Sequence, residues 1–369
     1  VKEKLGYGLG DTASHFVWDM VGFWILIFYT DTFGISAAAA GTIMFIARAW
    51  DMISDPLMGV ISDRTRTRWG KFRPYILWMA LPYGVLAVLA FTTPDLDQTG
   101  KVIYAAVTYL LLMTAYTAIN LPYSSLGAVM TSDSIERTSL NTYRFVCAFV
   151  GQLIVSGLAL TLALYFGQGD NAKGYRLTVT LFAVISFVLF MITFFSTRER
   201  IQPPKAQEHS LKKDFRILLA NRPWIILAVV GVVSFVMFAL QNLSLAYYFK
   251  YYIGREESVQ LFNVVGSIAL IVALPLSKPL ARRFGKRNTF IGSSILSGTF
   301  FVLLYLPGAD SIGWIYALNI LGKMAYAPAV PLLWTMIADA ADYAEWKNGR
   351  RATGLFFSAA TFAQKGGWG

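Results

Sequence analysis

The sequence has few of the residues on which soluble enzymes commonly rely. Its 369 residues include two histidines, His15 and His209, which are too far apart to form a close zinc-binding pair. Cys147 is its one cysteine, which excludes an intrachain disulfide. No Gly-Lys pair is followed by Ser or Thr, which excludes the usual phosphate-binding loop. We therefore expect neither an enzyme nor a bound cofactor.

Charged residues are also scarce. They make up 14% of the chain, whereas a soluble domain has about 25%. Hydrophobic residues make up 56%, and apolar runs of about 20 residues, the length of a membrane-spanning helix, recur throughout. The alternating ten-residue pattern of a membrane barrel does not occur. The composition predicts an all-α integral membrane protein.

The apolar runs predict ten spans and the start of an eleventh, near Ala352, which is cut off at Gly369. The ten spans cover about 12–32, 36–61, 75–92, 102–127, 139–167, 176–196, 223–252, 258–281, 289–307 and 313–338. The longest polar joint, 197–222, follows the sixth span, and we expect it to be a cytoplasmic linker with a surface helix at 210–220. It would separate an N-terminal six-helix bundle, 1–196, from an incomplete C-terminal bundle, 223–369.

The basic residues gather in alternate joints. One set of joints and the N-terminus hold 22 Lys and Arg residues, and the other set, counting the adjoining span ends, holds five. This bias predicts that the N-terminus is cytoplasmic. It also explains the net charge of +11 without a nucleic-acid partner.

The two halves resemble each other at one joint. Residues 68–73 read Arg-Trp-Gly-Lys-Phe-Arg, and residues 282–288 read Arg-Arg-Phe-Gly-Lys-Arg-Asn. Each follows the second span of its half. A repeat of six-span halves is typical of the major facilitator fold. We therefore expect that fold, truncated here within the eleventh span.

Two carboxylates lie inside the second span. Asp51 and Asp55 are four residues apart and share a helix face, with Ser54 close to the same face. An acid at the bilayer centre costs about 3 kcal/mol, so a span rarely contains two without a functional reason. Their oxygens predict a site for a small cation, with Na⁺ as one candidate.

The first span contains a second polar group. His15 and Asp19 are four residues apart, and Trp18 lies beside them. We expect Asp19 to accept hydrogen bonds from hydroxyl groups and Trp18 to offer a stacking face. The alternative is that His15 and Asp11 cap the start of the helix.

Further polar candidates occur in later spans. The stretch from Thr117 to Ser125 contains Pro122, which frees a backbone carbonyl; helix packing by small residues is the alternative. Arg144 either pairs with an acid of the second span or lies at the membrane interface. Weaker candidates in the second half are Gln241, Asn242, Lys323, Trp334 and Lys365.

Charged residues at the cytoplasmic ends predict a gate. We expect the arginine-rich joints to form ion pairs with acids at the end of the tenth span, although the joint 62–74 could merely anchor a helix end. The residues concerned are Arg64, Arg68, Lys71, Arg73, Arg283, Asp339, Asp342 and Glu345.

Four motifs together resemble one family. They are Asp51-x-x-Ser54-Asp55-Pro56, the loop from Asp63 to Pro74, Asn120-Leu121-Pro122-Tyr123, and Ala338-Asp339-x-x-Asp342-Tyr343-x-Glu345. From Gly6 to its last residue the chain resembles the glycoside–pentoside–hexuronide:cation symporters, the melibiose permease family. It looks closer to the xyloside- and glucuronide-type carriers than to the melibiose permease.

This resemblance implies roles for individual residues. The cation ligands would be Asp51, Ser54, Asp55 and Thr117. Arg144 would be the family's functional arginine, and Lys365 its lysine near the cation carboxylates. Together with our interpretation of the polar and aromatic residues in the spans, this assigns the sugar site to His15, Trp18, Asp19, Asn120, Ser124, Arg144, Trp334 and Lys365. His15 and Asn120 stand where the melibiose permease has acids that bind galactosyl hydroxyls, so melibiose is not assumed as the substrate.

The resemblance also implies a function. The family transports sugars across the bacterial cytoplasmic (inner) membrane with H⁺, Na⁺ or Li⁺, by alternating access. We expect a monomer whose partners are a glycoside or sugar, a monovalent cation and membrane lipid. A lysolipid transporter of related fold is the alternative. It would need an apolar cavity, whereas the candidate residues are polar and aromatic.

Overall fold

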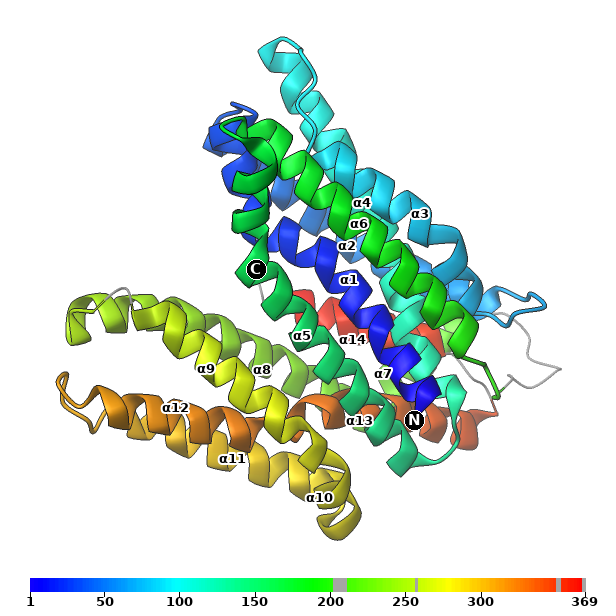
Figure 1. The fold of residues 1–369 in the computed structure, drawn as a ribbon. Coiled ribbons are helices and arrows are strands. Elements are labelled where there is room, and N and C mark those ends of the chain that lie inside the picture. Colours follow the sequence, from blue (N-terminus) through cyan, green and yellow to red (C-terminus); the bar gives the residue numbers. More distant parts are fainter. Residues whose placement is uncertain (202–210, 256–257, 350–352, 367–369) are drawn as a thin grey trace. The chain divides into compact units, whose positions relative to one another are not determined.

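The computed structural model describes the residues 1–201, 211–255, 258–349 and 353–366, without the side chains of 211–215, 235, 238–239, 242–243, 246–247 and 363–366. In this part of the chain the secondary structure is helical, apart from one isolated bridge between Thr67 and Gly70 (Figure 1). The predicted all-α fold class is confirmed.

The helices follow the predicted spans. Their bounds are α1 (Lys2–Ile27), η1 (Phe28–Thr32), α2 (Ala37–Arg64), α3 (Arg73–Ala90), α4 (Gln98–Met130), α5 (Ser134–Gly167), α6 (Asn171–Ser196), α7 (Leu211–Ala220), α8 (Arg222–Tyr247), η2 (Tyr248–Ile253), α9 (Ser258–Ala273), η3 (Leu274–Leu276), α10 (Ser277–Phe284), α11 (Lys286–Leu303), α12 (Ile312–Tyr326), α13 (Ala329–Asn348) and α14 (Thr353–Gly366). The predicted helix at 210–220 corresponds to α7, and the predicted eleventh span corresponds to α14.

Seven helical segments in the described part are long and apolar enough to span a membrane. Helix α2 is not among them, because Arg48, Asp51 and Asp55 lower the mean hydropathy of its apolar stretch. Its polar content therefore marks it as a helix that needs protein neighbours around its acids.

The helices form two compact units, which are described separately. Unit 1 comprises 1–130, 147–202 and 353–358, and unit 2 comprises 131–146, 203–352 and 359–369. The chain passes from one unit to the other after Gln202, inside the predicted linker. The start of α5 belongs to unit 2 and the start of α14 belongs to unit 1, so both helices contribute to both units.

Unit 1 is built by close packing between long helices. Helix α1 packs on α6, α3 packs on α4 and α6, and α2 packs on α4, as Figure 1 shows for the blue, cyan and green ribbons. The buried rings of Tyr7 and Tyr123 stack with centroids 4.9 Å apart, and the Tyr123 hydroxyl donates to the Tyr7 carbonyl. A Cβ on Gly10 would lie 2.5 Å from the Tyr123 ring, so the approach of α1 to α4 requires a glycine there.

In unit 2, α12 packs against α9 and α11, and α13 packs against α8 and α11. One of its cores consists of Phe249, Ile253, Phe262 and Ile315. The side-chain amide of Asn319 donates to the Phe262 carbonyl at 2.8 Å, which satisfies a polar group in this apolar surrounding.

The first span of each unit ends in the same way. Helix α1 passes into the π-helix η1 and α8 passes into the π-helix η2, a rare conformation in proteins. Gly34 and Gly254 follow, with φ angles of 78° and 70°. In both cases the next residue donates its N–H to the carbonyl six residues earlier, Tyr29 at 3.0 Å and Phe249 at 3.1 Å. The two halves therefore share a local structure, although their sequences there have only an aromatic pair and the glycine in common.

Candidate functional site

The predicted cation ligands lie together in unit 1. Asp51 and Asp55 are 2% and 1% exposed on α2, and Ser54 is buried beside them. Thr117 of α4 donates its hydroxyl to Asp55 Oδ1 at 2.9 Å. Ser54 Oγ is buried without a hydrogen-bond partner among the described residues. Asp55 and Thr117 thus meet at the interface of α2 and α4, with Asp51 and Ser54 buried on the adjoining turn of α2.

Pro56 adds a further acceptor to this region. A proline lacks the N–H that would bind the carbonyl four residues earlier, so the Met52 carbonyl loses its α-helical donor. That carbonyl lies on the same helical turns as the two acids. Carbonyl, hydroxyl and carboxylate oxygens are the ligands that hard cations prefer.

Arg48 is a neighbour of this group that the sequence analysis did not identify. Its Nη1 lies 3.9 Å from Asp51 Oδ2, one helical turn away. Its Cζ lies 6.0 Å from the centroid of the Trp18 ring on α1. Arg48 therefore lies between an acid of the predicted cation site and a predicted sugar-binding residue.

The predicted sugar-binding residues of α1 also lie in unit 1. His15 Nδ1 is 2.9 Å from Asp19 Oδ2, and the Asp19 side chain is buried. The rings of Trp18 and Tyr116 stack with centroids 4.2 Å apart. The alternative in which His15 and Asp11 cap the helix is wrong, because α1 begins at Lys2.

Helix α4 joins these two groups through consecutive residues. Tyr116 stacks on Trp18, and Thr117 binds Asp55. Further along α4, the Ser124 hydroxyl donates to the side-chain amide oxygen Oδ1 of Asn120 at 3.2 Å. A shift of α4 would therefore reach the acids of α2 and the aromatic face on α1 together.

Arg144 of the predicted fifth span and Trp334 of the predicted tenth span both lie in unit 2. Arg144 is 5% exposed, and its Cζ lies 4.9 Å from the centroid of the Trp334 ring. Asn141 donates to the Thr335 hydroxyl at 3.0 Å, which fixes the start of α5 on α13. The burial of Arg144 disfavours the alternative of a side chain at the membrane interface. Pairing of Arg144 with an acid of α2 stays a prediction, and the side chain of Lys365 lies outside the described residues.

The basic loop 62–74 is held by two acids of its own unit. Lys71 Nζ lies 2.8 Å from Asp63 Oδ1, and Asp63 Oδ2 accepts the backbone N–H of Leu355 at the start of α14. The sequence analysis did not identify the second acid, Glu199. Its carboxylate accepts three backbone N–H groups, those of Lys71, Phe72 and Arg73, at 2.7–3.0 Å. Glu199 therefore caps the N-terminus of α3.

The rest of the loop is arranged around this cap. Gly70 has a φ of 108°, and a Cβ there would lie 2.3 Å from the Glu199 carboxyl carbon. The Arg73 guanidinium donates to the Phe194 carbonyl at 2.7 Å. Arg64 and Arg68 are exposed, and the Arg68 guanidinium lies 4.4 Å from the centroid of the Trp69 ring.

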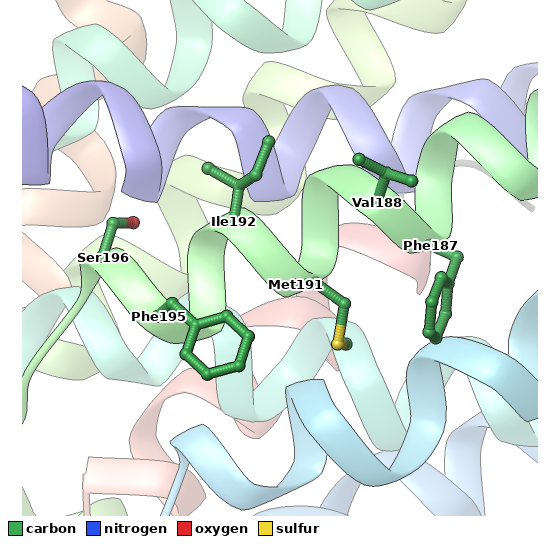
Figure 2. Close-up of a pocket in the computed structure, with 6 residues that line it drawn as sticks. All are labelled: Phe187, Val188, Met191, Ile192, Phe195 and Ser196. Carbon is green, nitrogen blue, oxygen red and sulfur yellow. The ribbon is translucent and has the colours of Figure 1, made fainter.

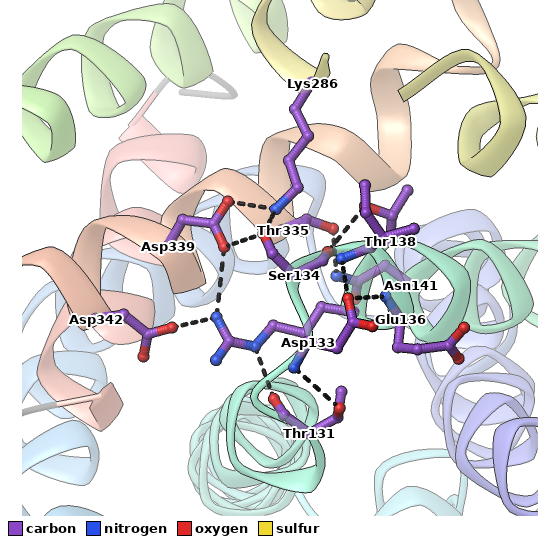
Figure 3. A network of polar contacts seen from close by, with 12 residues as sticks. Thr131, Asp133, Ser134, Glu136, Thr138, Asn141, Lys286, Thr335, Asp339 and Asp342 are labelled. Carbon is purple, nitrogen blue, oxygen red and sulfur yellow. Dashed lines mark hydrogen bonds and ion pairs between the residues drawn. The ribbon is translucent and has the colours of Figure 1, made fainter. Parts of the chain in front are cut away.

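The acids at the end of α13 form a network inside unit 2, shown in Figure 3. Asp339 forms ion pairs with Arg137 and Lys286 and accepts a hydrogen bond from Ser134. Arg137 also forms an ion pair with Asp342. Burial lowers the pKa of Lys286, although the nearby Asp339 carboxylate acts in the opposite direction.

Arg137, at the centre of this network, is 2% exposed, and the sequence analysis did not identify it. Of the other predicted gating residues, Arg283 is exposed and Glu345 is half-buried. The contacts described here are within single units, so a gate formed by these charges stays a prediction.

Among the described residues, no group of three or more His, Cys, Asp or Glu side chains could hold a metal ion. A cation at Asp51 and Asp55 would therefore need neutral oxygens, such as those of Ser54 and Thr117, as its other ligands. This arrangement stays a prediction.

A family model described as "MFS/sugar transport protein" matches residues 6–369. The chain belongs to this family. It is 39% identical over 365 residues to "Putative glycoside/cation symporter YagG" of Escherichia coli K12, covering 99% of this chain and 79% of the relative. It is 34% identical to an isoprimeverose transporter of Lactiplantibacillus pentosus, covering 100% and 77%. It is 30% identical to "Glucuronide carrier protein homolog" of E. coli K12, covering 98% and 80%.

Solved structures support the same fold. The proton:xylose symporter XylE of the major facilitator superfamily matches with a TM-score of 0.65 and 14% identity, covering 100% of this chain and 86% of that one. A bacterial homologue of ferroportin in its outward-facing state matches with a TM-score of 0.70 and 14% identity, covering 100% and 89%. The predicted major facilitator fold and the predicted multi-pass membrane location are confirmed.

Proposed function

We propose that the chain is a cation-coupled symporter for a sugar or glycoside in the cytoplasmic membrane and works by alternating access. The observation that carries this proposal is the buried set of Asp51, Ser54, Asp55 and Thr117 beside the stacked rings of Trp18 and Tyr116. The names of the family members describe glycoside, isoprimeverose and glucuronide carriers. Nothing in the comparisons supports the lysolipid alternative.

The cation would act first on the acids of α2. Two buried carboxylates four residues apart repel each other, and a bound cation offsets that repulsion. Thr117, a proposed ligand of the cation, follows Tyr116, whose ring stacks on Trp18. A bound cation that orders this part of α4 would therefore also hold the aromatic face of the sugar site in place. Coupling of this kind is reciprocal, because each ligand raises the affinity for the other by the same factor.

The sugar would meet an aromatic face and a buried acid. Trp18 offers its ring to an apolar sugar face, and Asp19 accepts hydroxyl hydrogen bonds while His15 holds its other oxygen. Arg144 and Trp334 lie against each other in unit 2 and stay predicted sugar-binding residues. Asp19 lies one helical turn after His15, the position at which the melibiose permease has its acid. The acid that binds the sugar from α1 would therefore occupy a different position in this chain.

The test is uptake of labelled glycosides, including xylosides and glucuronides, into vesicles with an imposed cation gradient. Asp55→Asn removes one cation carboxylate, and we expect it to abolish gradient-driven accumulation. Asp95→Asn is the matched control, because Asp95 is an exposed acid, and its uptake should equal that of the parent chain. Unchanged accumulation by Asp55→Asn would overturn the proposal. Calorimetry of Na⁺ binding with and without glycoside then identifies the coupling cation.

A further inference from the structure

A shallow apolar groove runs along the outer face of α6. Figure 2 shows its lining, which comes from one helix: Phe187, Val188, Met191, Ile192, Phe195 and Ser196. The groove is open, and Phe195 is 76% exposed. In a membrane-spanning helix, exposed apolar side chains of this kind lie against lipid chains.

The groove ends where the basic loop packs on α6. The Trp69 ring lies 5.9 Å from Phe194, the residue before Phe195, and the Arg68 guanidinium lies over Trp69. Ser196 ends the helix, and Arg198 follows it. Arg68 and Arg198 are both exposed. An apolar surface and two available guanidinium groups therefore meet at one end of α6.

The acids at this end of unit 1 already have partners. Asp63 pairs with Lys71, Glu199 accepts three backbone N–H groups, and Glu3 pairs with Arg200. No ion pair joins Arg68 or Arg198 to an acid within the part of the chain that the structure describes. The end of the groove therefore has a surplus of positive charge.

We propose that this surface binds an anionic phospholipid. One acyl chain lies in the groove over Val188, Ile192 and Phe195, and the phosphate lies against Arg68 and Arg198. Guanidinium groups bind phosphate oxygens through paired hydrogen bonds, and the groove supplies the apolar contact that a soluble anion cannot use. The site rests on the membrane-spanning fold and not on the transported sugar, so it is tested independently of the proposed function.

The test uses the whole chain in bilayers of phosphatidylcholine with spin-labelled phosphatidylglycerol. The measured quantity is the association of the labelled lipid relative to labelled phosphatidylcholine. The double variant Arg68→Gln/Arg198→Gln should lose preference by about fivefold for each arginine removed. The control Lys173→Gln/Arg176→Gln removes the same charge from exposed residues at the opposite end of α6 and should retain the preference.

A second variant tests the groove without changing charge. Ile192→Trp fills it and should lower phosphatidylglycerol binding, while circular dichroism and gel filtration check the fold of every variant. Equal preference in the parent chain and the arginine variant would overturn the proposal, as would an equal loss in the control. Full displacement of the lipid by millimolar inorganic phosphate would also overturn it, because the site would then bind phosphate alone.

Discussion

Thr117 connects α4 with an acid of the predicted cation site. Its hydroxyl donates to Asp55 Oδ1 at 2.9 Å in a buried surrounding. Thr117→Val keeps the shape but removes the donor and a cation ligand. A hydrogen bond to a charged group contributes about 1.5–3 kcal/mol, so we expect cation affinity to fall by at least roughly tenfold. The cation affinity is measured by titrating Na⁺ or Li⁺ and following the binding of glycoside.

The control for this prediction is Thr117→Ser, which keeps the hydroxyl and should stay within about threefold of the parent chain. Sugar affinity at saturating cation should change little in either variant, since Thr117 is assigned to the cation. Equal cation affinities for the Val and Ser variants would contradict the role given to the hydroxyl.

Some residues of the candidate site could be predicted and others could not, for physical reasons. Asp51 and Asp55 stand out because acids are costly inside an apolar run. Arg137 lies in a polar joint, where an arginine usually faces water, and only folding buries it between Asp339 and Asp342. Tyr116 is one aromatic residue among many until the structure places it on Trp18.

At the scale of elements, the cap of α3 is the feature that a variant can test most directly. Glu199 satisfies three of the N–H groups that a helix start leaves without partners. We expect Glu199→Ala to destabilise the chain by about 2 kcal/mol, and Glu199→Gln by less because it keeps one acceptor. Thermal unfolding in detergent measures both.

Glu3→Ala is the matched control for Glu199. Glu3 forms one ion pair with Arg200, and both side chains are partly exposed, so its loss should cost between about 0 and 1 kcal/mol. If Glu3→Ala and Glu199→Ala lower the melting temperature equally, the cap is not what stabilises this end of unit 1.

The division into units depends on which neighbours each end of a helix packs against, and the sequence does not reveal these neighbours. Hydropathy located α5 and α14, but it does not tell on which neighbours each end of a helix packs. The start of α14 meets α2 at Gly59, where a Cβ on Gly354 would lie 2.5 Å from the Gly59 carbonyl oxygen. The start of α5 is fixed to α13 by Asn141. Such contacts depend on glycines and single hydrogen bonds, which hydropathy does not detect.

For the whole molecule, the orientation predicted from the basic joints can be measured. Cys147 is the one cysteine and is buried, so single cysteines can be introduced after its replacement by Ala. Arg66→Cys and Arg282→Cys should react with an impermeant maleimide in inside-out vesicles. Asp97→Cys and Asp310→Cys should react in right-side-out vesicles.

All four of these positions are exposed in the structure, so access depends on the side of the membrane and not on burial. Labelling of Arg66→Cys from the outside would reverse the proposed topology. If the two positions of either pair react from different sides of the membrane, the joints do not alternate between the two sides as predicted.

The fold as a whole was predictable because lipid restricts the backbone. A chain segment in a bilayer must satisfy its own hydrogen bonds, so each long apolar run can be only a helix. Helix α2 departs from this pattern, because its acids lower its mean hydropathy. The π-helices were not predicted. Their sequences share only two adjacent aromatic residues and the glycine that follows, Phe28-Tyr29 with Gly34 and Tyr248-Phe249 with Gly254, a pattern that does not by itself specify a π-helix.

Those π-helices also bear on the history of the chain. The same turn, with a left-handed glycine and a hydrogen bond spanning six residues, closes the first long helix of each half. Two independent origins of so specific a turn at matching places would require the same rare event twice. We infer that one ancestral six-helix gene already encoded this turn before it was duplicated. The backbone conformation of this turn is the same in both halves, although most of the side chains differ.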